Sequence, residues 1–189
     1  MKKIIISFAA ILTACAHQTL NTEQYLAQSG ATAQQFSEQL GDTLKQQIQT
    51  GGVESAIPVC KQIAPTLAAQ YSTDKKVVKR VSNKNRNAIQ GSPDTWEKAA
   101  LTRFQAAINT DQQNQNLEFS EVVTENNHRY FRYAKGIRVQ ALCLKCHGQA
   151  QDISPNVQKL LNEHYPNDRA AGYQVGDLRG AISIKTRLD

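Results

Sequence analysis

The feature that most constrains this chain is the run Cys143-Leu144-Lys145-Cys146-His147, a Cys-x-x-Cys-His sequence. Two thiols two residues apart can each form a thioether with one vinyl group of the same porphyrin, and the adjacent imidazole can then reach its iron. The spacing predicts one covalently attached haem c. Cys143 and Cys146 would be the thioether residues, and His147 the proximal iron ligand.

Three other interpretations compete with haem attachment: a chance run, a reactive dithiol and half of a zinc site. A thioredoxin-like dithiol is expected at the start of a helix that follows a strand in a βαβ pattern, and the flanking sequence does not have that pattern. A zinc site requires a second Cys/His pair at ligand spacing, and the sequence contains none. Together with the export signal described next, these observations favour haem.

The N-terminus has the pattern of a secretory signal. Met1-Lys2-Lys3 is followed by an apolar stretch over residues 4–12 and by Leu12-Thr13-Ala14-Cys15. The apolar stretch is too short for a membrane span. The last four residues resemble a lipobox, so we predict a lipoprotein signal peptide over residues 1–14 and lipidation of Cys15. An ordinary signal peptide cut nearby and a core helix are the alternatives.

The mature chain is expected on the periplasmic side of a bacterial membrane. Ala16 stands where an aspartate often signals inner-membrane retention, so we expect the outer membrane. Acyl chains would hold the protein at the membrane surface. Residues 15–32 are polar and small and predict a flexible tether, and residues 33–189 predict one domain.

The charge does not indicate a nucleic-acid partner. Residues 1–14 contain two lysines and no acid, so their removal lowers the formal net charge from +6 to +4. Two haem propionates would offset two further charges. The basic residues are spread along the chain and no aromatic-basic motif accompanies them, so we predict no nucleic-acid binding.

The ligand opposite His147 is not fixed by the motif. Methionine is excluded because Met1, the only methionine, lies in the signal peptide. The candidates are Cys60, His128 in a polar turn, His164 at a helix end, a lysine or an open position. Cys60 lies on an apolar helical stripe. That placement suits a buried thiol as well as an iron ligand, and an intermolecular disulfide is a third use of a lone exported thiol.

Four stretches of the sequence resemble a family of exported PAS-like c-type cytochromes, first described as a bacterial haem domain of unknown function. They are residues 52–60, 80–87, 130–148 and 172–181. The resemblance covers most of residues 35–187. It implies an α+β fold in which a PAS-like antiparallel sheet and N-terminal helices enclose a c-type haem, with Cys60 as the distal iron ligand.

The patterning predicts helices that lead into an antiparallel sheet, with an excursion between the last two strands. One helix runs from Ala33 to a stop at Gly51-Gly52, and a second carries Cys60 and is kinked or ended by Pro65. Asp94 and Glu97 predict a capping box at the start of a third helix, and Ser154-Pro155 opens a fourth. The predicted strands are residues 76–82, 117–124, 128–138 and 179–186, and the middle two form a hairpin.

Basic residues near the predicted strands are candidates for pairing with haem propionates: Arg80, Lys84, Arg86, Arg132 and Arg138. Tyr130 and Arg132 flank the aromatic strand that leads into the haem motif. Of the nearby residues, these two are the ones we predict to lie close to the cofactor.

Two classes of function fit these features. The first is a periplasmic electron carrier or redox-responsive haem protein, which requires a redox partner that the sequence does not identify. The alternative is a haem-based redox or gas (CO/NO) sensor that signals through a separate partner. No residues resemble an added general acid-base pair, so a non-enzymatic role is expected. A Cys60 thiolate would give a low-potential haem, because thiolate donates electron density to ferric iron.

Overall fold

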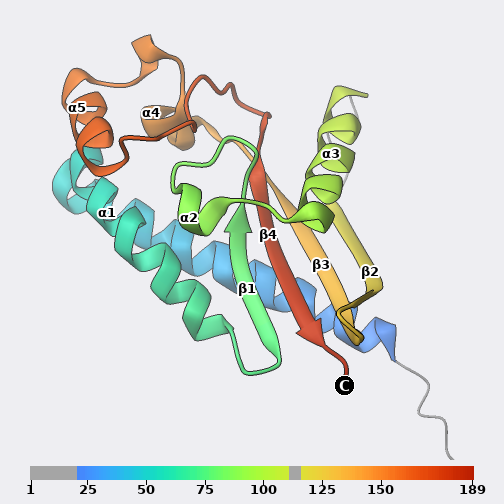
Figure 1. The fold of residues 1–189 in the computed structure, drawn as a ribbon. Coiled ribbons are helices and arrows are strands. Elements are labelled where there is room, and N and C mark those ends of the chain that lie inside the picture. The colour runs from blue at the N-terminus through green and yellow to red at the C-terminus, as the bar shows by residue number, and fades with distance from the viewer. Residues whose placement is uncertain (1–20, 111–115) are drawn as a thin grey trace, which may run out of the picture.

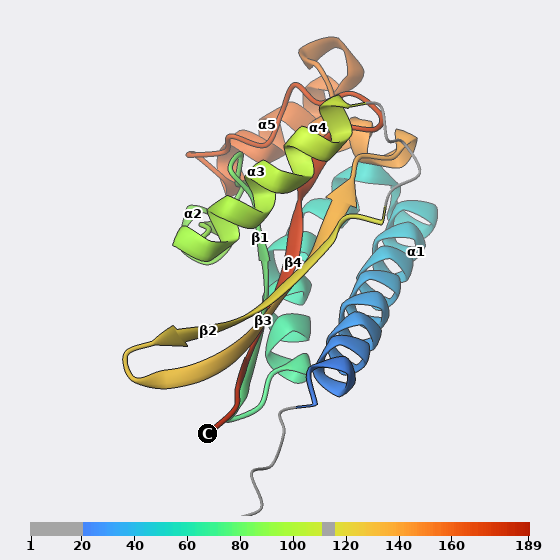
Figure 2. The same ribbon diagram turned by 90° about the vertical axis from the view of Figure 1, so that its right-hand side faces the viewer.

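The computed structural model describes residues 21–110 and 116–189. The predicted signal peptide and Cys15 lie outside these residues. A four-stranded antiparallel sheet carries the N-terminal helical segment on one side and a single long helix on the other (Figure 1, Figure 2). The predicted α+β class, with N-terminal helices against an antiparallel sheet, is confirmed.

The N-terminal helical segment, α1 (Thr22–Tyr71), is a hairpin of two arms. It turns at Gly52, whose φ of 79° and ψ of 177° define a backbone conformation that is essentially restricted to glycine. The predicted stop at Gly51-Gly52 is confirmed. The second arm, residues 53–71, continues through Pro65 to Tyr71. Of the predicted kink or end at Pro65, the end is therefore wrong.

The prediction of a flexible tether over residues 15–32 is wrong from Thr22 onward, because α1 begins there. The Asn21 side chain caps the helix by accepting a hydrogen bond from the backbone N–H of Gln24 at 3.1 Å. Tyr25 stacks on Phe131 of the sheet, with ring centroids 5.7 Å apart. Ser29, Gly30 and Thr32 have weaker helix propensity than alanine, and packing against the sheet overrides that weakness.

The strands are β1 (Lys76–Val81), β2 (Glu118–Glu125), β3 (His128–Arg138) and β4 (Leu178–Arg187), in the order β1-β4-β3-β2. All neighbours are antiparallel. The β2–β3 turn places Asn126 and Asn127 at φ of 51° and 61°, and two-residue hairpins of this kind favour asparagine at such positions. The four predicted strands are confirmed.

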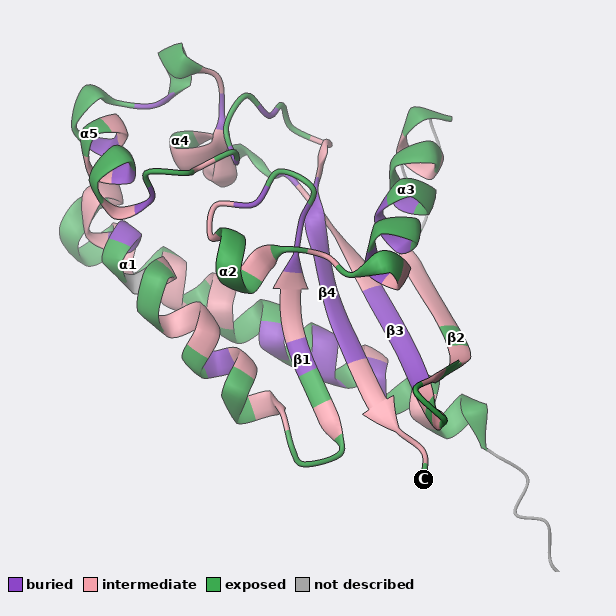
Figure 3. Cartoon of the chain, in the orientation of Figure 1, coloured by how far each residue is buried: buried purple, intermediate pink, exposed green. Residues whose placement is uncertain are grey.

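The two faces of the sheet bury separate cores. Toward α1, Phe131 and Tyr133 of β3 pack in a cluster with Phe36 and Leu67. Toward α3 (Thr95–Asn109), Ala134 of β3 packs in a second cluster. Figure 3 shows that buried residues concentrate along β3 and β4. The predicted capping box is present, because Asp94 accepts from the Glu97 N–H and Glu97 accepts from the Asp94 N–H, both at 2.8 Å.

The excursion between β3 and β4 contains only short elements: η1 (Ala141–Cys143), α4 (Leu144–His147), η2 (Ala150–Asp152) and α5 (Pro155–His164). A small apolar cluster joins Ile57 of the second arm of α1 to Ile153, Val157 and Leu161. This packing places the haem motif beside the arm that carries Cys60. Within the part of the chain that the structure describes, no helix is both long and apolar enough to cross a bilayer.

Candidate functional site

A cavity of about 520 Å³ lies between the second arm of α1, β1, and the residues that lead from β1 through α2 (Ala88–Gly91). Ligand and cofactor sites have volumes of this order. Cys60 and His147 both line it. The two residues lie far apart in the sequence, and the fold brings them to one cavity.

The ring of His147 has the tautomer and the neutral state that binding a metal ion through Nε2 requires. Its Nδ1 lies 2.7 Å from the carbonyl oxygen of Ala170. A carbonyl can only accept, so Nδ1 carries the proton and Nε2 keeps its lone pair. Burial lowers the pKa of His147 well below its usual range, and the charge of Arg179 lowers it further. The imidazole is therefore neutral, the form that coordinates metals.

The thiol of Cys60 is half-buried in the second arm of α1. Burial raises the pKa of Cys60, and the charges of Arg80, Arg86 and Arg179 oppose that rise. A thiol that binds a metal ion binds as the thiolate and releases its proton to solvent. A raised pKa in the metal-free chain is thus compatible with a thiolate ligand.

Cys143 and Cys146 are half-buried beside the cavity and are not among its lining residues. Cys143 lies against the cluster that contains Val139, and Cys146 against the cluster that contains Ile57. Burial raises the pKa of Cys146 to about 11, and the charge of Arg86 opposes the rise. Cys60, Cys143 and Cys146 are all free thiols.

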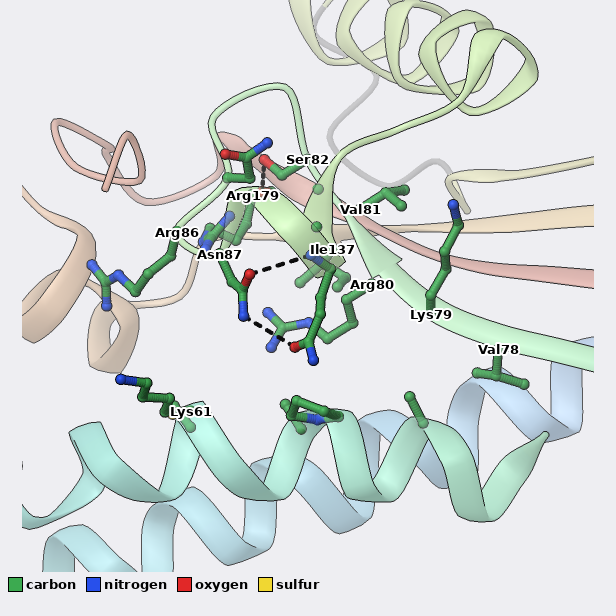
Figure 4. A pocket seen from close by; sticks show the side chains of 18 of the residues that line it. Lys61, Val78, Lys79, Arg80, Val81, Ser82, Arg86, Asn87, Ile137 and Arg179 are labelled. Atoms are coloured by element: carbon green, nitrogen blue, oxygen red, sulfur yellow. Dashed lines mark hydrogen bonds between the residues drawn. The ribbon is translucent and has the colours of Figure 1, made fainter. Parts of the chain in front are cut away.

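The cavity lining is cationic. Among the described residues, the lining includes no aspartate or glutamate and five basic residues: Lys61, Lys79, Arg80, Arg86 and Arg179. Lys79 turns its ammonium away to Glu97, and Arg86 pairs with Asp168, so Lys61, Arg80 and Arg179 are the three without a carboxylate partner in the described chain. Figure 4 shows Lys61 on the helix and the arginines on the segments across the cavity from it. Like charges this close repel one another in a partly dry site. Such a lining favours an anionic ligand.

Arg80 and Arg179 are the two cavity arginines without a carboxylate partner in residues 21–110 and 116–189. The Arg80 guanidinium has neither a hydrogen bond nor an ion pair within that part of the chain, and Arg179 donates to the Lys84 carbonyl at 3.4 Å. Burial lowers the pKa of Arg179 to about 10, and the charge of Arg80 contributes. A bound anion would offset both the burial of these guanidinium groups and the repulsion between them.

The structure does not bring Tyr130 and Arg132, the two residues predicted to lie close to the cofactor, to the cavity. Side chains alternate along a strand, so both residues lie on the α3 face, opposite the cavity. There Arg132 is 1% exposed and pairs with Asp94 at 2.7 Å and Glu125 at 2.8 Å. Tyr130 lies beneath the ammonium of Lys185, 4.1 Å from the ring centroid.

Of the other basic candidates, Arg80 and Arg86 line the cavity, and Lys84 and Arg138 do not. Lys84 lies over the ring of Tyr173, and Arg138 donates to the Gly176 carbonyl. Sequence reasoning missed Arg179, although it lies in one of the four recognised stretches. Its place beside β1 follows from the β1–β4 pairing, which no local pattern reveals.

The alternative ligands to iron are also placed by the structure. His128 lies at the start of β3 and contacts Arg187 and Asp189, and His164 ends α5; neither lines the cavity. Two lysines do, but Lys79 is paired with Glu97 at 2.9 Å. Cys60, Lys61 and an open position therefore remain as the candidates opposite His147.

The fold and site together define an α+β domain in which a helical hairpin and the edge of an antiparallel sheet enclose a cationic cavity with one imidazole and one thiol. The chain belongs to the Tll0287-like family, whose model matches residues 13–187. This confirms that the four stretches reflect membership of a known family.

A solved structure supports the same relationship. The chain is similar to the structure described as the crystal structure of the cyanobacterial haem protein Tll0287, with a TM-score of 0.62 and 26% sequence identity. The match covers 88% of this chain and 96% of that one. No curated protein matches the chain.

Proposed function

We propose that this protein is an exported monohaem c-type cytochrome with His147 and Cys60 as axial ligands, acting in periplasmic electron transfer or as a redox-responsive haem protein. The observation that carries the proposal is the cavity that unites an imidazole, a thiol and three basic residues, Lys61, Arg80 and Arg179, that have no carboxylate partner in the described chain. Kinship with a protein described as a haem protein supports it.

The residues around the cavity fit a porphyrin with two carboxylate side chains. Apolar lining residues such as Ala64, Val78 and Ile137 suit its ring, and Arg80 and Arg179 suit its propionates. Covalent attachment through Cys143 and Cys146 requires their sulfurs to turn toward the cavity. The motif spacing and the adjacent His147 support that attachment.

When bound, haem supplies a one-electron iron couple. The chain's own residues would set the conditions for it. Ala170 orients the His147 ring, so that Nε2 is the unprotonated nitrogen, and Arg179 Nε lies 3.5 Å from it. Cys60 would donate electron density that stabilises the ferric state, so we expect a low-spin ferric protein of low reduction potential. The arginines would offset the propionate charges.

The place of the protein in the cell is part of the proposal. The Leu12-Thr13-Ala14-Cys15 run supports lipidation at Cys15. Lipid would anchor the domain on the periplasmic side of a bacterial membrane, and outer-membrane sorting is expected from Ala16. Labelling with a radioactive fatty acid tests this: a Cys15→Ala protein should carry no label, and an equally labelled variant would contradict it.

A haem-based redox or gas sensor is the second candidate. The feature that favours it is the position of Cys60 on a helix arm that turns at Gly52, because an arm that releases its ligand on reduction could change conformation. Carbon monoxide tests the difference. A dithionite-reduced protein that never binds carbon monoxide would exclude ligand release at Cys60.

The deciding experiment is made on protein from cells with haem-maturation machinery. Intact mass should exceed the polypeptide mass by one haem, and a Cys143→Ser/Cys146→Ser variant should lose that increment. The Cys60→Ala variant should retain haem and lose the low-spin ferric spectrum. Lys61→Ala is the matched control, because it changes the neighbouring lining residue. A colourless wild-type protein of polypeptide mass would overturn the proposal, and an unchanged Cys60→Ala spectrum would remove Cys60 as ligand.

A further inference from the structure

The His147 ring is oriented by a carbonyl in a segment without regular secondary structure. Ala170 lies between α5 and β4, and its oxygen is 2.7 Å from His147 Nδ1. A hydrogen bond of this kind fixes the orientation and basicity of a metal-binding imidazole. The orientation of the ring therefore depends on what holds Ala170 in place.

Asp168 holds the backbone of Ala170. One carboxylate oxygen, Oδ1, accepts a hydrogen bond from the Ala170 N–H at 2.8 Å. The backbone N–H of Asp168 in turn donates to the Tyr165 carbonyl at 2.9 Å. Ala170 is fully buried, so its polar backbone groups need partners within the protein.

Arg86 joins this segment to the haem motif. Its Nε lies 2.9 Å from the other carboxylate oxygen of Asp168, Oδ2. The same guanidinium donates to the Cys146 carbonyl at 2.5 Å and approaches the Ala170 carbonyl at 3.5 Å. The two side chains are only 12% and 14% exposed. A planar guanidinium can hold three acceptors in a fixed arrangement, which an ammonium cannot.

Backbone hydrogen bonds keep the two segments side by side without fixing the ring. The N–H groups of Gly172 and Tyr173 donate to the carbonyls of Gly148 and His147 at 2.8 and 3.0 Å. These bonds leave the imidazole free to rotate about its side-chain torsions. Two polar contacts act on the ring itself: the Ala170 carbonyl lies 2.7 Å from Nδ1, and Arg179 Nε donates to Nε2 across 3.5 Å. The Ala170 contact is the shorter of the two, and it depends on the side-chain network that holds Ala170.

We infer that Arg86 and Asp168 are positioning residues that fix the axial imidazole through the Ala170 carbonyl. The inference rests on the proposed haem ligation by His147. Under this inference, Arg86 acts on the orientation of His147, although its side chain also lines the cavity. Asp168 does not line the cavity, so a change there tests the network without altering the haem pocket itself.

The test uses the Asp168→Asn holoprotein. Asparagine keeps an oxygen for the Ala170 N–H and loses the charge that holds Arg86. We expect full haem mass with about tenfold faster solvent exchange of the His147 Nδ1 proton, the scale of losing one charge-assisted hydrogen bond. Proton NMR of the ferric protein measures that exchange, and the g-values of its electron paramagnetic resonance spectrum should shift.

The matched control is Glu118→Gln, which breaks another partly buried 2.9 Å ion pair, with Lys135 on the β2–β3 hairpin. It should leave both signals unchanged. A folded Asp168→Asn protein with wild-type exchange and g-values overturns the inference. If that variant does not fold, Arg86→Lys is the second test, because it keeps the charge and loses the planar fork. Wild-type exchange of the His147 Nδ1 proton in Arg86→Lys would also overturn the inference. A wild-type protein without haem mass refutes the proposed function instead.

Discussion

Buried arginines occur on both faces of the sheet, and their surroundings are opposite. On the α3 face, Arg132 lies among Asp94, Glu97 and Glu125, and Glu97 also receives Lys79. On the α1 face, Arg80 and Arg179 point to a cavity that no described carboxylate lines. The first group is neutralised by the chain itself. The second has no carboxylate partner in the described chain, and a bound anion would neutralise it.

The comparison separates two uses of buried charge. A buried ion that is paired within the chain contributes to fold specificity, and removing one partner is costly. A buried ion without a partner reduces the stability of the free protein and is available for a ligand. The two faces should therefore differ in how much stability they lose to the same kind of substitution.

The largest effect is expected on the α3 face. Arg132→Met removes the cation shared by three carboxylates and leaves Glu97, which is 1% exposed, with Lys79 alone. Loss of one partner of a buried pair costs about 3–5 kcal/mol. Urea unfolding followed by circular dichroism measures this. A loss below about 1 kcal/mol would mean that the network is not buried as described.

The matched substitution on the cavity face is Arg80→Met. Because Arg80 has no carboxylate partner in the described chain, we expect the free energy of unfolding to change by about 0.5 kcal/mol or less. In the haem-loaded protein, loss of a nearby cation favours the ferric state, so the midpoint potential should fall by on the order of 50 mV. Redox titration measures this shift. If Arg80→Met instead caused a large loss of stability and left the midpoint potential unchanged, the proposed difference between the two faces would be wrong.

Acid should weaken the α3 face first. Burial acts to raise the pKa of Asp94, but hydrogen bonds from the Glu97 N–H and Arg132 outweigh it and lower the pKa below the usual 3.8. A lowered folded-state pKa gives stability above the unfolded pKa that is lost as the pH falls through the folded value.

Thermal unfolding between pH 6 and pH 3 should therefore show wild-type stability falling below about pH 4. Asp94→Asn should reduce that fall. The difference should stay below about 1 kcal/mol, because the Asp94 side chain is 42% exposed. An equal fall in both proteins would assign acid sensitivity to other carboxyl groups.

The smallest effect is expected at the Lys135–Glu118 pair, whose side chains are 32% and 26% exposed. Lys135→Ala should cost about 0.5 kcal/mol or less, because water and salt screen such pairs. Urea unfolding at low and high salt measures this cost in the free energy of unfolding, and the other variants can be compared with it. A cost that approaches that of Arg132→Met would show that burial does not distinguish the two ion-pair groups.

Local sequence signals predicted the elements well, because their causes are local. Asp94 and Glu97 specify a helix start through their own hydrogen bonds. Asn126 and Asn127 tolerate the positive φ of a tight turn. The errors arose where contacts between residues far apart in the sequence determine the local structure. Thr22 begins a helix because α1 packs against the sheet, and Pro65 is tolerated within the second arm.

The site was predicted only in part for the same reason. Strand alternation places the side chains of Arg132 and Tyr133 on opposite faces of the sheet. The sequence alone does not say which of these faces carries the cavity. The Cys-x-x-Cys-His motif indicates a chemistry without indicating its neighbours. Arg179 joins the cavity because β4 pairs with β1, and Asp168 reaches Arg86 across 82 residues of sequence.

The position of β1 at the end of the sheet has a consequence for how the protein avoids self-association. Consecutive residues of β1, from Val77 to Val81, all line the cavity, so the cavity runs along the strand's unpaired border. Exposed borders of this kind template pairing with other chains. An occupant of the cavity shields that border, so a chain that receives its ligand late stays open to aggregation for longer.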